Sequence, residues 1–263
     1  TCAATPTLPT ATSVTTTGAT IGWTASAAGG GAGTISYTVN VFTDPARTTH
    51  APNSPYASTT SVSQGVTGLS AATTYYYRIV ASNGSCNSGN LDGSFTTACA
   101  NSSLTLNEGF NTSGTAVFPT CWTQQTVVGT SNITFQTGST NPTTTPQEGT
   151  RFVYWNCFSI ASGNETRLVS PPITTTGTAS VDVDFQWFHD NTAYTTAGYA
   201  DEGVFVEYSL DGSSWTTVGS QITRLGGTNG WNLKTVTLPA GAGNQATIYV
   251  GFRFRSRFGN NCA

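Results

Sequence analysis

The side chains best suited to chemistry are concentrated in one stretch, HDNTAYTTAGYADEG, at residues 189–203. Its members are a histidine, three carboxylates and two tyrosines: His189, Asp190, Tyr194, Tyr199, Asp201 and Glu202. Carboxylate oxygens are the ligands that Ca²⁺ prefers, and tyrosine rings stack on sugars. The stretch is therefore a candidate site for Ca²⁺ or for a glycan. The simpler interpretation, which we favour, is a connector between strands whose acids face water.

Catalytic arrangements are not indicated elsewhere in the sequence. Two histidines are present, and none of the motifs GxSxG, HExxH or Walker A occurs. The run GGGAG at 29–33 lies between two expected strands without a following helix or lysine. We therefore expect a hairpin loop there rather than a phosphate site. The chain is expected not to be an enzyme.

Charged residues alternate with apolar ones in two expected strands. Asp182 and Asp184 are interleaved with valines. Arg253, Arg255 and Arg257 are interleaved with phenylalanines and a serine. We expect the two strands to be antiparallel neighbours whose opposite charges form a ladder outside the core. A carboxylate pair for glycoside hydrolysis is the alternative, but acids two residues apart that face arginines favour the structural interpretation.

The composition narrows the classes of function. Of 263 residues, 8% are charged, against about 25% in a typical soluble domain, and the net charge is −3. Such a charge offers no basic surface for nucleic acid or for anionic membranes. No run of about 20 apolar residues occurs, so we expect no membrane insertion. The length suffices for two domains, each with its own core.

The cysteines indicate an oxidising environment. Six are present, none with the CxxC spacing of zinc sites: Cys2, Cys86, Cys99, Cys121, Cys157 and Cys262. An even number of cysteines with so few histidines favours disulfides over metal ligation. The sequence opens on Thr1 with neither a methionine nor a signal peptide, so we interpret it as a segment of an exported, extracellular protein.

Short alternating runs separated by Gly, Asn, Pro and Ser predict an all-β chain. The run ISYTVNV, for example, places Ile35, Tyr37 and Val39 on one face of a strand. No stretch has a sustained helical period with caps. We therefore expect two β-sandwich domains in series, at 1–98 and 99–263.

The first domain resembles a fibronectin type III domain. The resemblance rests on Trp23, Tyr37, the dipeptide Gly-Leu at 68–69 and the run TTYYYRIVASN. It says little about function, because such modules serve as spacers, binders and enzyme appendages. In that fold the chain start and the loop before the last strand lie at the same pole. The resemblance thus implies a disulfide between Cys2 and Cys86, which stabilises by about 2–4 kcal/mol.

From Leu104 onward eight candidate strands follow, the first within LTLNEGFN. The motifs NEGFN, FPTCW, RLVSPPI, VEYSLDGSSW and VGFRFRS resemble the jelly-roll sandwich of the MAM-like group, in particular bacterial cleaved-adhesin or choice-of-anchor J modules. The resemblance implies that Glu108 helps to coordinate a structural Ca²⁺ together with acids on a final strand. That strand would begin at Cys262, so we expect the domain to lack it. Pairing among the other four cysteines stays open, with three connectivities.

A missing strand of this type would have a large energetic effect. It buries about three apolar side chains, so its loss removes on the order of 5–9 kcal/mol. It also leaves an unpaired sheet edge, which natural proteins avoid or occupy. Three explanations stay open: residues omitted from the sequence, a strand added by a neighbouring subunit, or a loop that covers the edge.

Tryptophans offer a further candidate surface for a glycan. Trp155, Trp187, Trp215 and Trp231 could form an exposed platform on which a sugar stacks. Most tryptophans of small sandwiches belong to the core, and we expect at least two of these four to be buried.

These observations favour a non-enzymatic extracellular adhesin or fibre subunit. We expect it to self-associate or to bind other surface proteins through an open sheet edge. The alternative is a carbohydrate-binding accessory module of a secreted hydrolase. Its candidate sugar contacts are Tyr194, Tyr199 and Trp155. The candidate Ca²⁺ ligands are Glu108, Asp190, Asp201 and Glu202.

Overall fold

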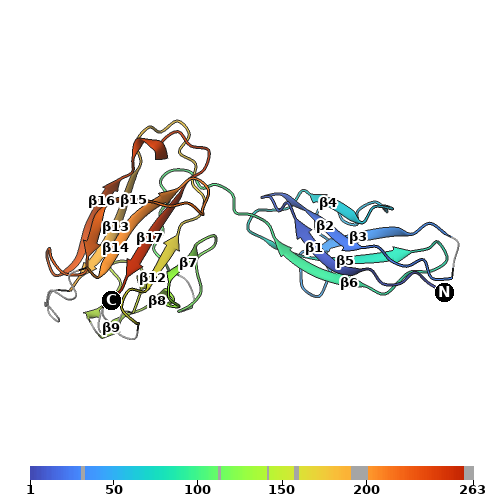
Figure 1. The fold of residues 1–263 in the computed structure, drawn as a ribbon, viewed down its shortest axis with the longest axis horizontal. Helices are drawn as coiled ribbons and strands as arrows, with labels where there is room; N and C mark the ends of the chain where they lie inside the picture. The colour runs from blue at the N-terminus through green and yellow to red at the C-terminus, as the bar shows by residue number, and fades with distance from the viewer. Residues whose placement is uncertain (31–32, 112–113, 141, 157–159, 191–200, 258–263) are drawn as a thin grey trace. The chain divides into compact units, whose positions relative to one another are not determined.

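The structure is a computed structural model that describes residues 1–30, 33–111, 114–140, 142–156, 160–190 and 201–257. The chain divides into two compact units, Thr1–Ala100 and Asn101–Ala263. Beyond the one-turn helix η2, Ala240–Ala242, the described residues form strands, turns and loops (Figure 1). The predicted all-β class with two sandwich domains is confirmed. Within the described ranges no helix has the length and hydropathy needed to span a bilayer.

The first unit is a sandwich of two antiparallel three-stranded sheets, with the orders β1-β2-β4 and β3-β5-β6. The strands are β1 Thr7–Thr12, β2 Gly18–Thr24, β3 Ser36–Phe42, β4 Ser63–Thr67, β5 Thr74–Ser82 and β6 Leu91–Thr96. The period of two decides which side chains fill the space between the sheets. In β5, for example, Tyr75, Tyr77 and Ile79 are buried while the residues between them are partly exposed.

Two aromatic rings from opposite sheets meet in the core of this unit. The ring centroids of Trp23 in β2 and Tyr37 in β3 lie 5.1 Å apart. The Tyr37 hydroxyl accepts a hydrogen bond from the Ser26 backbone N–H at 2.8 Å, so the buried ring keeps a partner for its polar end. Val39 is buried and Ile35 packs against the same cluster, which confirms the inward face predicted for this strand.

The disulfide between Cys2 and Cys86 closes one pole of the first unit, which confirms the pairing implied by the resemblance. The Asn83 side chain donates a hydrogen bond to the Thr1 carbonyl oxygen at 3.0 Å and holds the chain start at the same pole. Gly29 has φ +65°, and a Cβ at this position would overlap the Cys2 carbonyl oxygen. The described part of the glycine run is therefore a tight loop packed on the chain start.

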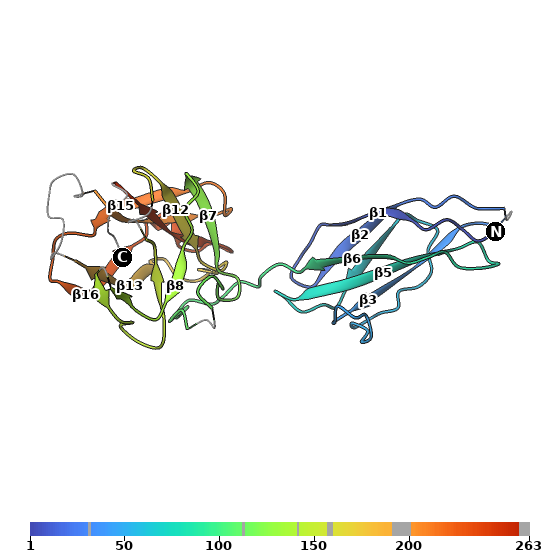
Figure 2. The same cartoon turned by 90° about the horizontal axis from the view of Figure 1, so that it is seen from below.

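The second unit contains an antiparallel five-stranded sheet of order β15-β14-β17-β12-β7. Its strands are β7 Thr123–Val128, β12 Glu165–Val169, β14 Gly203–Ser209, β15 Thr216–Thr223 and β17 Tyr249–Arg255. Three antiparallel pairs complete the unit: β13 Asp182–His189 with β16 Gly230–Thr237, β8 Thr134–Gln136 with β11 Phe152–Tyr154, and β9 Ser139–Thr140 with β10 Thr143–Thr144. Figure 2 shows β13, β16 and β8 on one side of this unit and β15, β12 and β7 on the other.

Two apolar clusters fill the space between these layers. In one, Val206 and Val250 of the five-stranded sheet lie together with Val181 and Leu238 of the opposite layer. The other consists of the buried residues Trp122, Ile133, Phe135, Trp155 and Leu168. Full burial of such a side chain stabilises the fold by about 1.5–3 kcal/mol. The second unit is thus a β-sandwich with its core between the five-stranded sheet and the β13–β16 and β8–β11 pairs.

The strand predicted within the stretch LTLNEGFN, residues 104–111, is wrong. The segment joins no ladder, and its residues Thr105 and Phe110 have φ values of 74° and 54°. A left-handed backbone interrupts a strand, because extended residues need negative φ. The Glu108 carboxylate also accepts the Phe110 N–H at 2.6 Å, so a local side-chain contact replaces a ladder bond.

The predicted charge ladder has the wrong partners. β17 lies between β12 and β14 in the five-stranded sheet, whereas β13 pairs with β16 in the opposite layer. The carboxylates that meet the arginines of β17 are Glu165 and Glu207, not Asp182 and Asp184. Alternation identified the face on which each charge lies, but it does not specify which strand lies alongside.

Candidate functional site

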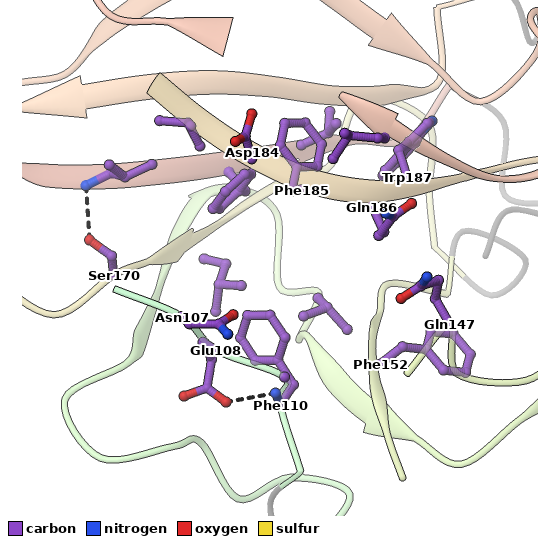
Figure 3. Close-up of a pocket in the computed structure, with 18 of the residues that line it drawn as sticks. Asn107, Glu108, Phe110, Gln147, Phe152, Ser170, Asp184, Phe185, Gln186 and Trp187 are labelled. Atoms are coloured by element: carbon purple, nitrogen blue, oxygen red, sulfur yellow. Dashed lines mark hydrogen bonds between the residues drawn. The ribbon is translucent and has the colours of Figure 1, made fainter. Parts of the chain in front are cut away.

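A cleft of about 630 Å³ lies beside β13 in the second unit. Its walls come from β13, from the segment 104–110 and from β11, and its floor is the inner face of the five-stranded sheet. The apolar floor residues are Leu168, Val204, Val250, Phe252 and Phe254. Figure 3 shows Asp184, Phe185 and Trp187 on one side of the cleft and Asn107, Glu108 and Phe110 on the other.

One edge of β13 has no strand beside it among the described residues. β13 pairs with β16, and the Leu238 N–H donates to the Val181 carbonyl oxygen at 2.9 Å. Both polar backbone groups of a residue in an antiparallel pair point to the same edge, and successive residues point to opposite edges. The backbone groups that point away from β16 are therefore those of Asp182, Asp184, Gln186 and Phe188.

The position of Arg224 shows that this free edge faces the cleft. The backbone groups of Asp190, two residues after Phe188, also point away from β16. The Asp190 N–H donates to the Arg224 carbonyl oxygen at 3.3 Å. Arg224 itself lines the cleft. The cleft thus runs along an unpaired sheet edge and ends at this hydrogen bond.

The floor of the cleft consists of core-type side chains that are incompletely covered. Phe252 and Phe254 point to the inner face of their sheet, yet both are half-buried. Their rings meet those of Phe185, at a centroid distance of 5.1 Å, and Trp187, at 6.4 Å. These two β13 side chains are also half-buried. An occupant of the cleft would complete the burial of these four rings.

The wall opposite β13 is formed by the irregular segment 104–110. Phe110 anchors it, because its ring stacks on Phe135 at 5.7 Å and meets Trp122 edge-on at 5.0 Å. Glu108 projects from this wall and accepts the Phe110 N–H. The wall therefore presents a carboxylate beside an aromatic anchor.

The cleft carries an excess of acidic groups. Four carboxylates line it, and none of them has an ion-pair partner among the residues that the structure describes: Glu108, Glu148, Asp182 and Asp184. Two of the arginines in the lining are neutralised by acids of the chain itself. Arg224 pairs with Glu202 at 3.1 Å and Arg255 with Glu165 at 2.5 Å. The remaining one, Arg151, donates to a backbone carbonyl at 2.7 Å.

The acids of the predicted Ca²⁺ cluster are engaged by arginines. Glu202 and Asp190 are buried and lie 3.1 Å and 3.8 Å from the guanidinium of Arg224. Asp201 lies 3.4 Å from Arg257. In the described ranges no three His, Cys, Asp or Glu residues come together as metal ligands, and Glu108 joins no such group. The described residues therefore do not fit a calcium site, and the calcium assignment stays a prediction.

His189 closes the end of β13 as a buried, neutral group. Burial lowers the pKa of its imidazole, and the Nδ1 atom lies 3.2 Å from the Arg224 carbonyl oxygen. Its Nε2 atom is buried, and no described residue forms a hydrogen bond with it. A neutral imidazole held against a carbonyl oxygen packs the end of the strand, and no sequence pattern indicated this role.

The described residues among the predicted sugar contacts, which are tryptophans, do not form an exposed platform. Tyr194 and Tyr199 lie outside the described residues. Trp155 is 4% exposed and packs against Phe254 at a centroid distance of 5.9 Å. The other three predicted platform residues, Trp187, Trp215 and Trp231, are half-buried, so the expectation that at least two of the four are buried is wrong. The guanidinium of Arg167 lies 4.4 Å from the centre of the Trp215 ring, and Trp187 and Trp231 line the cleft.

The outer face of the five-stranded sheet holds an ion-pair network that the sequence analysis missed. Arg253 bridges Glu207 at 2.7 Å and Glu165 at 2.6 Å, and Arg167 reaches Glu207 from the other side at 2.6 Å. The guanidinium of Arg253 also lies 4.2 Å from the centre of the Phe205 ring. The sequence placed Glu207 in an expected strand and Glu165 directly before one, but only the order of the strands in the sheet shows that they pair with Arg253.

This network shifts the protonation of its central acid. Burial by itself raises the pKa of Glu207, but hydrogen bonds from Arg253 and Arg167 outweigh it and leave the pKa lowered. The carboxylate is therefore ionised at neutral pH and fixed by two cations. Such a fixed pair stabilises the sheet and offers no free acid or base for catalysis.

Two of the other four cysteines are also used in disulfides. Cys99 and Cys121 are both disulfide-bonded, and the described residues include no free cysteine. Cys157 and Cys262 lie outside the described residues.

The family described as "Fibronectin type III domain" matches residues 4–92. These residues form a fibronectin type III domain, which confirms the resemblance seen in the first unit. The resemblance of the second unit to the MAM-like group stays a prediction. No curated protein sequence matches the chain.

The chain is similar to several solved structures. One, from work on carbohydrate-binding modules of the beta-sandwich super family, is 16% identical over 97% of this chain and 92% of that chain, with a TM-score of 0.38. The chicken CNTN1 FN1-FN3 domains are 14% identical over 98% of this chain and 95% of theirs, with a TM-score of 0.33. Chitinase ChiA74 from Bacillus thuringiensis is 13% identical over 96% of this chain and 26% of its own, with a TM-score of 0.29.

Proposed function

We propose that the chain is a non-catalytic module pair of an extracellular assembly, an adhesin or fibre subunit. Its second unit joins a neighbouring polypeptide by accepting a β-strand in the cleft beside β13. The observation that carries this proposal is the free edge of β13, which faces an apolar cleft of about 630 Å³. The disulfides and the fibronectin type III domain support an extracellular setting.

Backbone pairing and apolar burial favour a β-strand as the occupant of the cleft. Exposed sheet edges pair readily with other chains, and natural proteins cover them or use them. A strand added here would find backbone partners at Asp182, Asp184 and Gln186. Every second side chain of the strand would lie on the half-buried rings of the floor. Three such apolar side chains would contribute on the order of 5–9 kcal/mol before the cost of ordering the strand.

A structural role also suits the polar groups of the cleft. Catalytic acid–base chemistry needs a titrating group within reach of a substrate and a partner that orients it. His189 is buried, and it is neutral because burial lowers its pKa. Glu202 and Asp190 lie against Arg224. These groups hold the end of β13 in place, which supports the proposal of a non-catalytic module.

A proline at the free edge tests the proposed assembly. Gln186→Pro removes one backbone N–H that points into the cleft and leaves the ladder with β16 intact. Gln186→Thr is the matched control, because it removes the same side chain and keeps the N–H. Sedimentation velocity and negative-stain microscopy at high protein concentration should show oligomers or fibres for the native chain and the control, and monomers for the proline variant. Isolated particles of the native chain at high concentration would contradict self-association.

A second candidate function is that of a carbohydrate-binding accessory module of a secreted hydrolase. It is favoured by the lining of the cleft, which includes the rings of Trp231 and Phe188, with centroids 5.3 Å apart, and the amides of Gln147 and Gln186. Aromatic rings with a few amide groups are typical of sugar sites, and ligand pockets have volumes of about 300–1,000 Å³. A glycan array separates the candidates, since specific sugar binding that Trp231→Ala abolishes would favour the accessory module.

A further inference from the structure

The acids of the cleft are arranged along the line that an added strand would follow. Asp182 and Asp184 lie on the outer face of β13, at positions that alternate with the inward-facing Val183 and Phe185. Both carboxylates are exposed, and each uses one oxygen to accept a hydroxyl, from Thr237 and Thr235 of β16 respectively. The second oxygen of each carboxylate is available to a neighbour on the free edge.

Strand pairing fixes which side chains of an occupant meet these acids. In paired strands, directly opposite residues point to the same face. Residues of the occupant that face inward would therefore lie on Phe252 and Phe254, and those between them would lie on the outer face beside Asp182 and Asp184. Opposite charges at such positions attract, and like charges repel.

The chain already contains a strand of this kind in its other sheet. In β17, Phe252 and Phe254 face inward while Arg253 and Arg255 lie on the outer face. The arginines are held by glutamates of the two flanking strands, at 2.5 to 2.7 Å. An alternating apolar and basic strand between acidic neighbours is therefore stable in this fold.

From this charge complementarity we infer that the occupant of the cleft is an amphipathic β-strand of a separate polypeptide, with apolar residues at alternate positions and lysine or arginine between them. The inference rests on the proposed function and specifies its partner. Glu108 and Glu148 on the opposite wall add to the negative field that the basic residues would meet. The partner is thus recognised by backbone pairing, by apolar burial and by charge.

Two peptides that differ in charge alone test this inference. The probes are fluorescein-labelled TVKVKVT and TVEVEVT, which share the same valines and read alike in both strand directions. Fluorescence anisotropy at low salt should show that the lysine peptide binds at least about tenfold more tightly than the glutamate peptide. The reason is that two cross-strand pairs with Asp182 and Asp184 are attractive for lysine and repulsive for glutamate. The difference should shrink as salt is added.

Variants of the chain show where the peptides bind. Asp182→Asn with Asp184→Asn keeps an oxygen for each threonine hydroxyl and should remove most of the preference for lysine. Gln186→Pro should abolish binding of both peptides, and Gln186→Thr should not.

Each failure has a distinct meaning. Equal affinity of the two peptides for the native chain would refute the inference that the partner strand is basic, but not the proposal that the cleft accepts a β-strand. Binding of the lysine peptide that survives Gln186→Pro would mean surface attraction alone and would overturn the inference. No binding of either peptide would count against the proposed function itself. If the β13 edge of a longer natural chain is protected from hydrogen exchange without a partner, the occupant belongs to the same chain and the inference is wrong.

Discussion

Arg253→Met is the substitution whose effect follows most directly from the structure. The Arg253 guanidinium donates to Glu207 at 2.7 Å and to Glu165 at 2.6 Å. The three side chains are 12%, 4% and 10% exposed, so the pairs are largely desolvated. Breaking a buried ion pair by removing one partner costs about 3–5 kcal/mol. Arg167 still holds Glu207 and Arg255 still holds Glu165, so we expect the low end, about 3 kcal/mol.

Urea unfolding measures this loss. Methionine keeps much of the arginine's apolar volume over the Phe205 ring, so the change isolates the charge. The unfolding transition of the second unit should shift by about 3 kcal/mol, or by about 6–12 °C in Tm, while that of the first unit stays in place. Glu207→Gln combined with Arg253→Met should cost less than the sum of the single changes, because the uncompensated charge is gone. A loss below about 0.5 kcal/mol would refute the network as a source of stability, since that is the range of exposed pairs.

Three further outcomes follow from the same structure. The pKa of Glu207 in the folded chain is lowered from its ordinary 4.5. The ionised carboxylate therefore contributes fully to the stability of the second unit above pH 4.5, and this contribution is lost as the pH falls through the lowered pKa. Acid unfolding curves of the native chain and of Glu207→Gln should accordingly converge at low pH. Replacing Cys2 and Cys86 by serine removes a cross-link between residues 84 apart and should destabilise the first unit by about 4 kcal/mol in urea, the upper end of the range for a disulfide because the loop is long, with the second unit unchanged. Gly203→Ala should destabilise the second unit by more than 1 kcal/mol, because φ is +155° and a Cβ would overlap the Ile222 carbonyl oxygen, whereas Gly65→Ala, with open space around it, should not destabilise the first unit.

The sequence predicted local features well, because alternation reports which face of a strand is buried. The inward faces of β3 and β5 follow from a period of two, and Tyr37 and Ile79 are buried as that period requires. The pairing of Cys2 with Cys86 followed from the resemblance to a fibronectin type III domain, which fixes the positions of chain start and loop. The alternating pattern and the topology of a known fold were together sufficient to predict the buried faces and the disulfide of the first unit.

Neighbour relations in the second unit could not be read from the sequence. Arg224 pairs with Glu202 from a position 22 residues away, so an acid that suggested Ca²⁺ lies against an arginine that no local pattern connects with it. The arginines of β17 met Glu165 and Glu207 rather than the aspartates of β13, because strand order depends on packing between distant segments. The cleft arises because none of the described strands pairs with the second edge of β13, and a missing neighbour leaves no local pattern in the sequence.

Amide hydrogen exchange along β13 tests the central claim most directly. In the isolated chain we expect fast exchange at Asp182, Asp184 and Gln186, whose N–H groups point into the cleft, and slow exchange at Val183 and Phe185, whose N–H groups bond to β16. In the assembled form, or with the lysine peptide bound, all five amides should be slow. Slow exchange at Asp184 and Gln186 in the isolated monomer would contradict the account, because the edge would then be paired already.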